Sequence, residues 1–417
     1  MDLLRISTAG SVDDGKSTLI GRLLYDTNAL TKEQEQLIEK KTAEKGLKDL
    51  DFSVITDGLI AEREQGITID VAHIYFSTKN RKFIIADSPG HVEYTRNMVT
   101  GASNAEVSII LIDARKGLLE QSYRHFFISQ LLRLNTVVFC INKMDLVDYS
   151  EDVFLKIAAK VKEMVNSYEN YRPEIEIIPI SSLKGDNVVH EFGNTPWYQG
   201  PSLNAILHTI SPSEKEENLQ AFRMDVQQVL HVQNEQFVDF RGFSGRISSG
   251  QIKLGEELTV LPSGKTAVVK EIRQFETTLE EANTGDSVVI NLDREVDASR
   301  GSLFVKTNDQ PEASKSLKAT LVWLNEEEAQ LGRKYLIKAG CRQNQAKLQQ
   351  IDYLIPPENP SLKLQSSKLA LNDIAKIELR LAQPLYLDNY QLNKANGAFV
   401  LIDSQTNNTC AVGFVES

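Results

Sequence analysis

Gly-Ser-Val-Asp-Asp-Gly-Lys-Ser, residues 10–17, is the stretch that decides the fold of this chain. It matches the phosphate-binding pattern Gly-x-x-x-x-Gly-Lys-Ser/Thr at every position, and it lies between a predicted strand at 4–8 and a predicted helix at 16–24, the context that the motif requires. Backbone N–H groups of such a loop bind phosphate oxygens, aided by the positive end of the following helix. The predicted phosphate-binding residues are Gly10, Ser11, Val12, Asp13, Asp14, Gly15, Lys16, Ser17 and Thr18.

Two side chains of this loop have predicted chemical roles. Lys16 is placed to reach the β- and γ-phosphates, and the Ser17 hydroxyl is placed to reach Mg²⁺. The alternative is a glycine-rich turn between strand and helix that binds nothing, so the remaining sequence has to decide.

The composition sets limits on the class of protein. The chain has 417 residues, 57 acidic against 46 basic, and a net charge of −11. Length favours two or three domains, and the acidic balance argues against a broad nucleic-acid surface. Three widely spaced cysteines without a Cys-x-x-Cys pair favour a reducing cytoplasm. No apolar run is long enough to span a membrane, so we expect no membrane binding. Together with the charge balance and the cysteines, this predicts a cytoplasmic protein that does not bind nucleic acid.

The first half of the sequence alternates strand and helix patterns, which predicts an α/β fold with a mostly parallel sheet. Strands at 72–77 and 82–87 are separated by a short polar turn and are expected to form an antiparallel hairpin at the sheet edge. The other predicted strands are 4–8, 108–113, 136–142 and 175–179, and the predicted helices are 16–24, 32–45, 91–102, 121–132, 151–165 and 202–208.

The second half changes to short strands with glycine turns and no strong helical pattern, which predicts all-β barrels. Polar breaks at 211–218 and 308–312 separate the blocks. We therefore expect a P-loop domain at 1–213 followed by two β-barrel domains, at 214–308 and 309–417. The predicted strands are 222–232, 240–248, 257–260, 267–274, 286–291, 316–323, 334–339, 345–354, 373–382 and 398–404.

Residues 87–91, Asp-Ser-Pro-Gly-His, follow an apolar strand. An acid at the end of a buried strand near a P-loop can hold Mg²⁺, usually through water, and Gly90 can present its N–H to the γ-phosphate. The alternative for Asp87 is a helix N-cap. The predicted ligands of the nucleotide here are Asp87, Ser88, Pro89 and Gly90.

Thr68 lies in the polar stretch before the edge hairpin. A threonine on a switching segment can ligate Mg²⁺ through its hydroxyl, so the predicted metal ligands are Ser17, Thr68 and Asp87. The alternative is an ordinary threonine at the start of a strand, and Thr68 alone would not decide between them.

Residues 142–145, Asn-Lys-Met-Asp, end another apolar strand. The Asp145 carboxylate can accept two hydrogen bonds from guanine, whereas adenine offers no matching pair of donors. Asn142 and Lys143 can support the base, and backbone N–H groups of Ser181, Ser182 and Leu183 can meet the guanine O6. Each pattern alone is weak and fits a polar strand end equally well.

The order and spacing of these five segments favour GTP. Each stands in a loop beside a predicted strand, and in an open α/β sheet such loops gather at one edge. Five independent coincidences in that order are improbable, so we predict a GTP site.

The set of motifs, with two β-domains behind it, resembles the translation-factor class of GTPases, such as elongation factor Tu. The motifs that carry the resemblance are Val12-Asp13 in the P-loop, residues 63–68 (Arg-Glu-Gln-Gly-Ile-Thr) and residues 87–91. The resemblance implies that His91 orients the attacking water and that Val12 and Ile67 form an apolar gate. His91 is therefore the predicted catalytic residue, and the alternative is a surface histidine at the start of a helix.

Asp14 departs from the elongation factors, which carry histidine at this position. With Asp14 the chain is more similar to the large, GTP-hydrolysing subunits of bacterial sulfate adenylyltransferases. Further matching stretches are residues 20–26, 56–70, 94–98, 293–301 and 332–338.

This second resemblance implies a function. The family couples GTP hydrolysis to the synthesis of adenylylsulfate and pyrophosphate from ATP and sulfate. Only one nucleotide site is visible by motif, so ATP and sulfate are expected to bind a small catalytic partner subunit. The alternative is an elongation-factor-like GTPase that binds aminoacyl-tRNA, against which Asp14 and the acidic balance both count.

Overall fold

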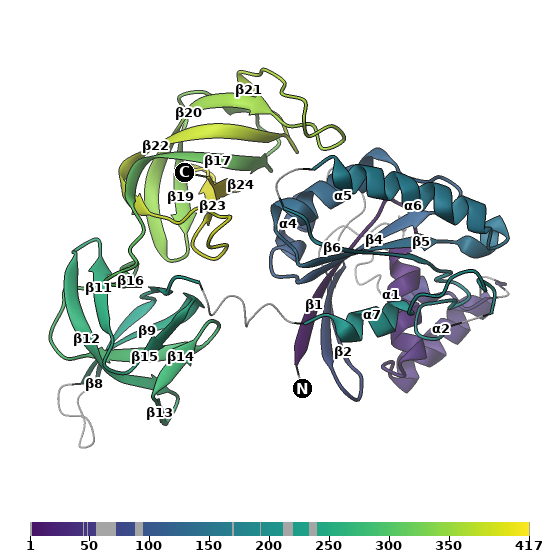
Figure 1. Ribbon diagram of the computed structural model, residues 1–417, viewed down its shortest axis with the longest axis horizontal. Coiled ribbons are helices and arrows are strands. Elements are labelled where there is room, and N and C mark those ends of the chain that lie inside the picture. Colours follow the sequence, from purple (N-terminus) through teal and green to yellow (C-terminus); the bar gives the residue numbers. More distant parts are fainter. Residues whose placement is uncertain are drawn as a thin grey trace. The chain divides into compact units, whose positions relative to one another are not determined.

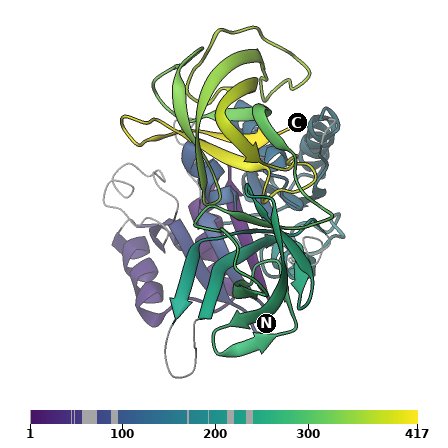
Figure 2. The same cartoon turned by 90° about the vertical axis from the view of Figure 1, so that its left-hand side faces the viewer.

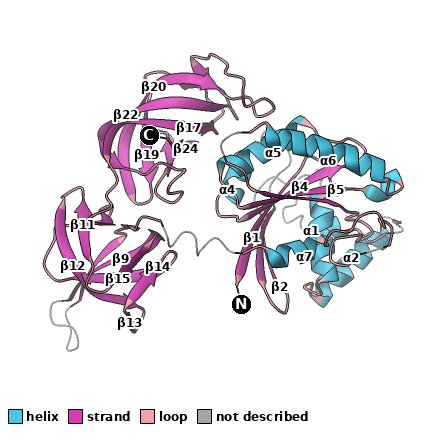
Figure 3. Ribbon diagram, viewed as in Figure 1, coloured by secondary structure: helices cyan, strands magenta, loops and turns pink. Residues whose placement is uncertain are grey.

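The computed structural model describes residues 2–44, 46–47, 49–55, 72–87, 95–168, 171–191, 193–211, 220–232 and 240–416. The chain divides into two compact units, Met1–Pro212 with Pro357–Ser361, and Ser213–Pro356 with Leu362–Ser417. In the part that is described, the first unit contains helices and strands and the second contains strands and loops (Figure 3). No helix in the described ranges is long and apolar enough to cross a membrane.

The first unit is built on a six-stranded sheet with the order β2-β3-β1-β4-β5-β6. All neighbours are parallel except β2 and β3, which pair antiparallel at the edge. The hairpin predicted at the sheet edge is thereby confirmed. The strands are β1 (Leu3–Ala9), β2 (Ala72–Ser77), β3 (Lys82–Asp87), β4 (Val107–Asp113), β5 (Thr136–Asn142) and β6 (Glu174–Pro179).

Helices cover both faces of this sheet, with α1 and α7 on one side and α4, α5 and α6 on the other (Figure 1). The α-helices are α1 (Lys16–Asp26), α2 (Lys32–Glu44), α4 (Thr95–Ala102), α5 (Glu120–Leu131), α6 (Glu151–Asn166) and α7 (Leu203–Thr209), and the 3-10 helices are η1 (Phe52–Ile55) and η3 (Met144–Val147). Because β4 and β5 are central, every one of their residues is buried, as expected for parallel strands covered on both faces.

The second unit begins with strands that close into a ring. Their order is β11-β16-β7-β9-β15-β12, and a further pairing of β11 with β12 closes it. Phe222, Met224, Ile247, Val260 and Ile290 are among the residues of its apolar core. The strands of this part are β7 (Arg223–Asp225), β8 (Gln228–Val232), β9 (Phe240–Ser249), β10 (Gln251–Lys253), β11 (Glu257–Leu261), β12 (Lys265–Gln274), β13 (Thr277–Leu279), β14 (Glu281–Asn283), β15 (Ser287–Leu292) and β16 (Leu303–Lys306).

The last strands form a second closed barrel, in the order β17-β22-β20-β19-β23-β24 (Figure 2). Its core contains Trp323, Tyr335, Ile377 and Phe399. The strands are β17 (Ala313–Trp323), β19 (Lys334–Ala339), β20 (Arg342–Leu354), β22 (Ile374–Tyr386), β23 (Ala398–Ile402) and β24 (Thr409–Val415), and a separate pair is formed by β18 (Ala329–Gln330) and β21 (Lys368–Leu369).

The predicted fold class, an α/β P-loop domain followed by two all-β barrels, is confirmed. The expected strand at 222–232 is wrong in detail, because it is two strands, β7 and β8. The two residues between them bond elsewhere: the Val226 N–H donates to the Ser302 carbonyl and the Gln227 N–H to the Ser244 carbonyl, each at 2.8 Å. The strands that were not predicted are β10, β13, β14, β16, β18, β21 and β24. The division at 213/214 and 308/309 stays a prediction.

Candidate nucleotide-binding site

The P-loop depends on glycine at two places where a side chain would collide with a neighbour. Gly15, the residue before helix α1, has φ 96°, and a Cβ there would lie 2.6 Å from Asn142 Nδ2. Gly10 has φ 155°, and a Cβ would lie 3.2 Å from the Leu111 carbonyl oxygen. Both positions need a residue without a side chain, so the loop lies directly against strands β4 and β5.

Lys16 is buried beneath the loop that precedes it. Its Nζ donates to the carbonyl oxygens of Gly10, at 2.8 Å, and Ser11, at 3.2 Å. Burial lowers the pKa of the Lys16 ammonium, and the charges of Asp87 and Asp14 act in the opposite direction. The ammonium group is thus fixed at the P-loop, where it can meet phosphate oxygens.

Asp14 shapes the same loop from within. Its Oδ2 accepts a 2.7 Å hydrogen bond from the Ser11 N–H, and its side chain is 2 % exposed. The other oxygen, Oδ1, has no hydrogen-bond partner among the described residues. Burial raises the pKa of Asp14 to about 6, although the bond from Ser11 and the charge of Lys16 lower it. Asp14 is therefore a buried acid that bends the loop and carries an incompletely compensated charge.

Asn142 joins the P-loop to the two segments predicted to read the base. Its Nδ2 donates to the Asp14 carbonyl oxygen at 2.7 Å, and its Oδ1 accepts from the N–H and the hydroxyl of Ser182, both at 2.9 Å. Next to it, the Ser181 hydroxyl donates to Asp145 Oδ1 at 2.6 Å. The structure therefore brings the P-loop, Asn142–Asp145 and Ser181–Ser182 together.

Lys143 crosses from the base-reading segment to the P-loop. Its Nζ donates to the Asp13 carbonyl oxygen and lies 3.1 Å from Asp113 Oδ2. Burial raises the pKa of Asp113, but hydrogen bonds from Arg115 and Lys143 outweigh burial and hold that pKa well below its usual range. Asp113 is thus a charged anchor that fixes the Lys143 stem beside the P-loop.

Asp87 ends strand β3 next to the P-loop. Its Oδ1 accepts a 2.9 Å hydrogen bond from the Thr8 hydroxyl, and its side chain is buried. Ser17, in the first turn of α1, is half-buried. A hydroxyl and a carboxylate are the hard oxygen donors that Mg²⁺ prefers. In the described ranges no group of three or more His, Cys, Asp or Glu side chains is arranged to hold a metal ion.

Five predicted site residues lie outside the described residues. They are Thr68, Ser88, Pro89, Gly90 and His91. Their predicted roles as metal, phosphate and catalytic residues stay predictions.

The loop after β6 is supported from the side of helix α1. Arg22 Nη1 donates to the Leu183 carbonyl oxygen at 3.4 Å, and the guanidinium carbon lies 5.3 Å from the centre of the Phe52 ring. Lys184 Nζ pairs with both carboxylate oxygens of Asp49, at 2.8 and 2.9 Å. Helix α1 and the segment around Phe52 are therefore in contact with the predicted guanine-binding loop.

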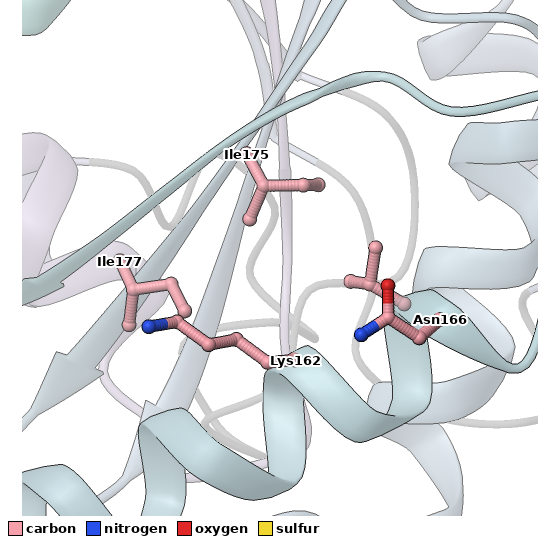
Figure 4. Close-up of a pocket in the computed structure, with 5 residues that line it drawn as sticks. Lys162, Asn166, Ile175 and Ile177 are labelled. Carbon is pink, nitrogen blue, oxygen red and sulfur yellow. The ribbon is translucent and has the colours of Figure 1, made fainter.

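A pocket of about 350 Å³ lies elsewhere in the first unit, between helix α6 and strand β6 (Figure 4). Lys162, Val165, Asn166, Ile175 and Ile177 line it. None of them belongs to the P-loop or to the base-reading segments, so the pocket is no part of the candidate site.

Sulfate adenylyltransferase subunit 1 of Colwellia psychrerythraea is 44% identical over 99% of this chain and 88% of its own length. The protein of the same name in Bacteroides fragilis is 45% identical over 99% of this chain and 86% of its own length. This chain belongs to the sulfate adenylyltransferase subunit 1 family.

Two domain families also match this member of the subunit 1 family. The elongation factor Tu GTP binding domain matches residues 1–239, and the GTP-eEF1A C-terminal domain-like family matches residues 316–416. The predicted resemblance to both the translation-factor class and the sulfate adenylyltransferase subunits is confirmed. Among solved structures, Sup35 complexed with GMPPNP aligns over 100% of this chain and 94% of its own, at 22% identity and a TM-score of 0.44, too low to bear on the fold.

Three residues that support the candidate site in this subunit 1 homologue were not predicted. Thr8 bonds Asp87, Asp113 anchors Lys143, and Arg22 bonds the loop after β6. Asp113 carried a usable signal, because it ends an apolar strand as Asp87 does. Arg22 carried none, since its partner Leu183 is 161 residues away in the sequence.

Proposed function

We propose that this chain binds and hydrolyses GTP as the GTPase subunit of a heteromeric sulfate adenylyltransferase. The observation that carries the proposal is Asn142, which bonds both the P-loop and the loop after β6. Phosphate-binding and base-reading groups are therefore held in one place, as a guanine nucleotide requires.

The phosphates of GTP would lie on the N–H groups of the P-loop at the start of helix α1. Lys16 would place its positive charge beside the β- and γ-phosphates. Ser17 and Asp87 would hold Mg²⁺, which neutralises charge on these phosphates when bound. The resemblance implies that Thr68 is the third protein ligand of this Mg²⁺.

The base would be read by Asp145. Its carboxylate is half-buried and is oriented by the 2.6 Å bond from the Ser181 hydroxyl. It can accept hydrogen bonds from the ring N–H and the exocyclic amine of guanine, and adenine would leave it unpaired. The N–H groups of residues 181–183 would face the guanine O6.

Hydrolysis and coupling are proposed from the resemblance. His91 would orient the attacking water, and Gly90 would bind the γ-phosphate so that its loss changes the loop. Coupling requires that the GTP- and GDP-bound forms bind the partner with different free energies.

The partner would be the small subunit that binds ATP and sulfate. The curated relatives are named subunit 1 of sulfate adenylyltransferase, which implies a further subunit in those proteins. Forming the anhydride between phosphate and sulfate is strongly uphill, and GTP hydrolysis would supply the driving force.

The first test is Asp145→Asn. An amide cannot accept both guanine bonds but can donate one to the extra oxygen of xanthine, so GTP affinity should fall roughly 100-fold while xanthosine triphosphate affinity rises. Calorimetry with both nucleotides measures this. Asp148→Asn is the matched control, because Asp148 is exposed and has φ 51°, which asparagine tolerates. Equal losses for both nucleotides in Asp145→Asn would contradict the guanine-reading role.

The second test concerns the complex. The chain is copurified from its host, and the complex is assayed for GTP-dependent adenylylsulfate synthesis. Synthesis that does not depend on GTP would contradict the coupling. Strong retention of tRNA by the purified chain, without a protein partner, would favour the elongation-factor-like alternative instead.

A further inference from the structure

Phe275 is the most exposed of the large apolar side chains in the described ranges, at 96 %. It lies at the tip of the β12–β13 hairpin, in the first barrel of the second unit. Gln274 pairs with Thr277, so Phe275 and Glu276 alone form the loop. An aromatic ring at such a tip is in water on nearly every side, which is unfavourable for an apolar group.

The backbone at Phe275 is also unfavourable for this residue. Its φ is 54°, and Glu276 does not share a positive φ. A positive φ at the first position of a two-residue hairpin loop is the place where glycine is favoured, and for a bulky residue it is an outlier. The conformation is therefore maintained despite two independent costs, strain and exposure.

The β19–β20 hairpin of the same chain provides an internal comparison. Its loop consists of Gly340 and Cys341, between the pair Ala339 and Arg342. Gly340 has φ 55°, nearly the value at Phe275. A first loop residue with nearly the same φ is thus glycine in one barrel and phenylalanine in the other, so this backbone conformation does not need an aromatic ring.

The hairpin presents the ring from a firm base. In the stem, Ile272 pairs with Leu279, and both belong to or pack against the apolar core of this barrel. A side chain held by a preformed stem loses less conformational entropy when it is covered by a partner than one on a loose loop does. Exposed aromatic side chains of this kind are typical anchors of protein interfaces.

The charges near the Phe275 ring indicate which class of partner surface can bind it. Glu276, the second residue of the loop, is exposed at the tip. At the base of the hairpin Lys270 and Glu280 are both exposed, and Arg273 pairs with Glu271 at 2.9 Å. The negative charge of Glu276 at the tip itself disfavours nucleic-acid phosphates and anionic lipid. It favours a protein pocket that is apolar inside and basic at its rim.

We propose that the tip formed by Phe275 and Glu276 docks into a basic-rimmed apolar pocket on the second subunit of sulfate adenylyltransferase. This inference rests on the proposed function, because it needs that subunit as the partner. It adds the place of contact, which the proposed function leaves open.

The test uses Phe275→Gly in the full chain and the separately purified second subunit. Glycine suits the turn, so the thermal midpoint should stay the same or rise, and GTP hydrolysis by the isolated chain should not change. Affinity for the second subunit, measured by biolayer interferometry, should fall at least tenfold. Phe275→Trp should retain binding. Leu331→Ser, which removes an exposed apolar side chain from the other barrel, should leave binding intact.

The outcomes separate the two proposals. If the wild-type chain forms no complex with the second subunit, the proposed function and this docking site both fall. If it forms the complex and Phe275→Gly binds equally well, only the docking site falls. Binding to phosphatidylcholine vesicles or to RNA that is lost in Phe275→Gly would also overturn the assignment to a protein pocket.

Discussion

Asp14 shows how one residue alters a phosphate-binding loop. An acid near phosphates is electrostatically unfavourable, yet this carboxylate accepts the Ser11 N–H and is buried with it. Its geometry fixes the loop, while its charge opposes the phosphates. Protonated Asp14 would still fix the loop but would no longer repel the phosphates. Mutation and pH can therefore separate these two effects.

The pH dependence at Asp14 has a definite sign. Burial raises its pKa in the folded chain from 3.8 to about 6. The folded state then binds more protons than the unfolded state between these values, so the stability contributed by protonated Asp14 is lost as the pH rises through about 6. Well above pH 6, this lowers the free energy of unfolding by on the order of 3 kcal/mol.

We therefore expect Asp14→Asn to raise the thermal midpoint at pH 7.5 and to change it little at pH 4, because the amide oxygen can still accept the Ser11 N–H. Thermal unfolding of both proteins from pH 4 to 8 measures this difference. GTP should bind several-fold tighter to the variant at pH 7.5, as calorimetry can show. A midpoint difference that is constant across the pH range would contradict the explanation.

Gly15 gives a second prediction at this scale. Gly15→Ala would place a Cβ 2.6 Å from Asn142 Nδ2, at a residue with φ 96°. The Asn142 link to the P-loop would have to move, so GTP affinity should fall at least tenfold, measured by calorimetry. Gly117→Ala is a control for the backbone cost alone, since Gly117 has φ 71° and a Cβ there meets nothing within 4 Å.

Where local pattern determines position, the sequence predicts well where a residue stands relative to helices and strands, whereas its role in the site stays a prediction. Lys16, Asp87 and Asn142 all stand at the ends of predicted elements, and the structure finds them at the ends of α1, β3 and β5. It does not predict the partner of Asp14, because a hydrogen bond three residues away inside an irregular loop follows no period of helix or strand. Long-range supports such as Arg22 are equally invisible, since only folding brings their partners near.

At the scale of elements, helix α1 contacts both the P-loop and the predicted guanine-binding loop. Its first residue is Lys16, and six residues later Arg22 contacts the loop after β6 and the ring of Phe52. The contact is close, because a Cβ on Gly185 would lie 2.3 Å from Arg22 Nη2, and a Cβ on Gly21 would lie 2.4 Å from the Phe52 carbonyl oxygen. The helix, the 3-10 helix η1 and the predicted guanine-binding loop therefore pack as one group.

Arg22→Ala should loosen the guanine-facing loop while leaving the phosphate contacts in place. We expect GDP affinity to fall roughly tenfold and the residual affinity for ADP, which is set by the phosphates, to change little. Fluorescent nucleotide binding measures both. Arg22→Lys should recover only part of the loss, because lysine lacks the planar fork. An equal loss for GDP and ADP would show a general loss of folding rather than a role in base recognition.

Elements of the first unit are predicted within about two residues where the described residues allow comparison, because buried parallel strands and amphipathic helices have clear sequence signals. The barrel strands are harder. The expected strand 222–232 divides at Val226 and Gln227, and β24 was missed. Such short strands are defined by the pairing partners that close a barrel, and those partners are distant in sequence.

At the scale of the whole molecule, the second unit is joined across its two barrels by a buried polar network. Arg223 of the first barrel donates to Asp388 of the second through Nε at 2.8 Å and Nη2 at 2.9 Å. Asn396 Nδ2 also donates to Asp388 at 2.7 Å, and Arg342 Nε lies 3.0 Å from Asp225 Oδ1. Charges buried in this way are paired and hydrogen-bonded, as stability requires.

The last prediction follows from this network. Asp388→Ala would remove the bidentate partner of the Arg223 guanidinium, whose side chain is 2 % exposed, and leave it the more distant Asp309 Oδ1 at 3.6 Å. Removing one member of a buried pair typically costs about 3–5 kcal/mol, because the remaining charge stays away from water. We expect the unfolding transition of the second unit to move to lower temperature in calorimetry. The first unit's transition should keep its shift on adding GTP, since a ligand stabilises only what binds it.

The matched control is Glu328→Ala, which breaks the pair with Lys368. Its two side chains are 59 % and 44 % exposed, so the pair should contribute less than about 1 kcal/mol. If Asp388→Ala proves as mild as Glu328→Ala, water must reach Arg223, and the two barrels are then held together by apolar contacts rather than by this network. If it is severe and Arg223→Met combined with it restores the midpoint, the penalty is that of an unpaired buried charge, because the apolar replacement needs no partner.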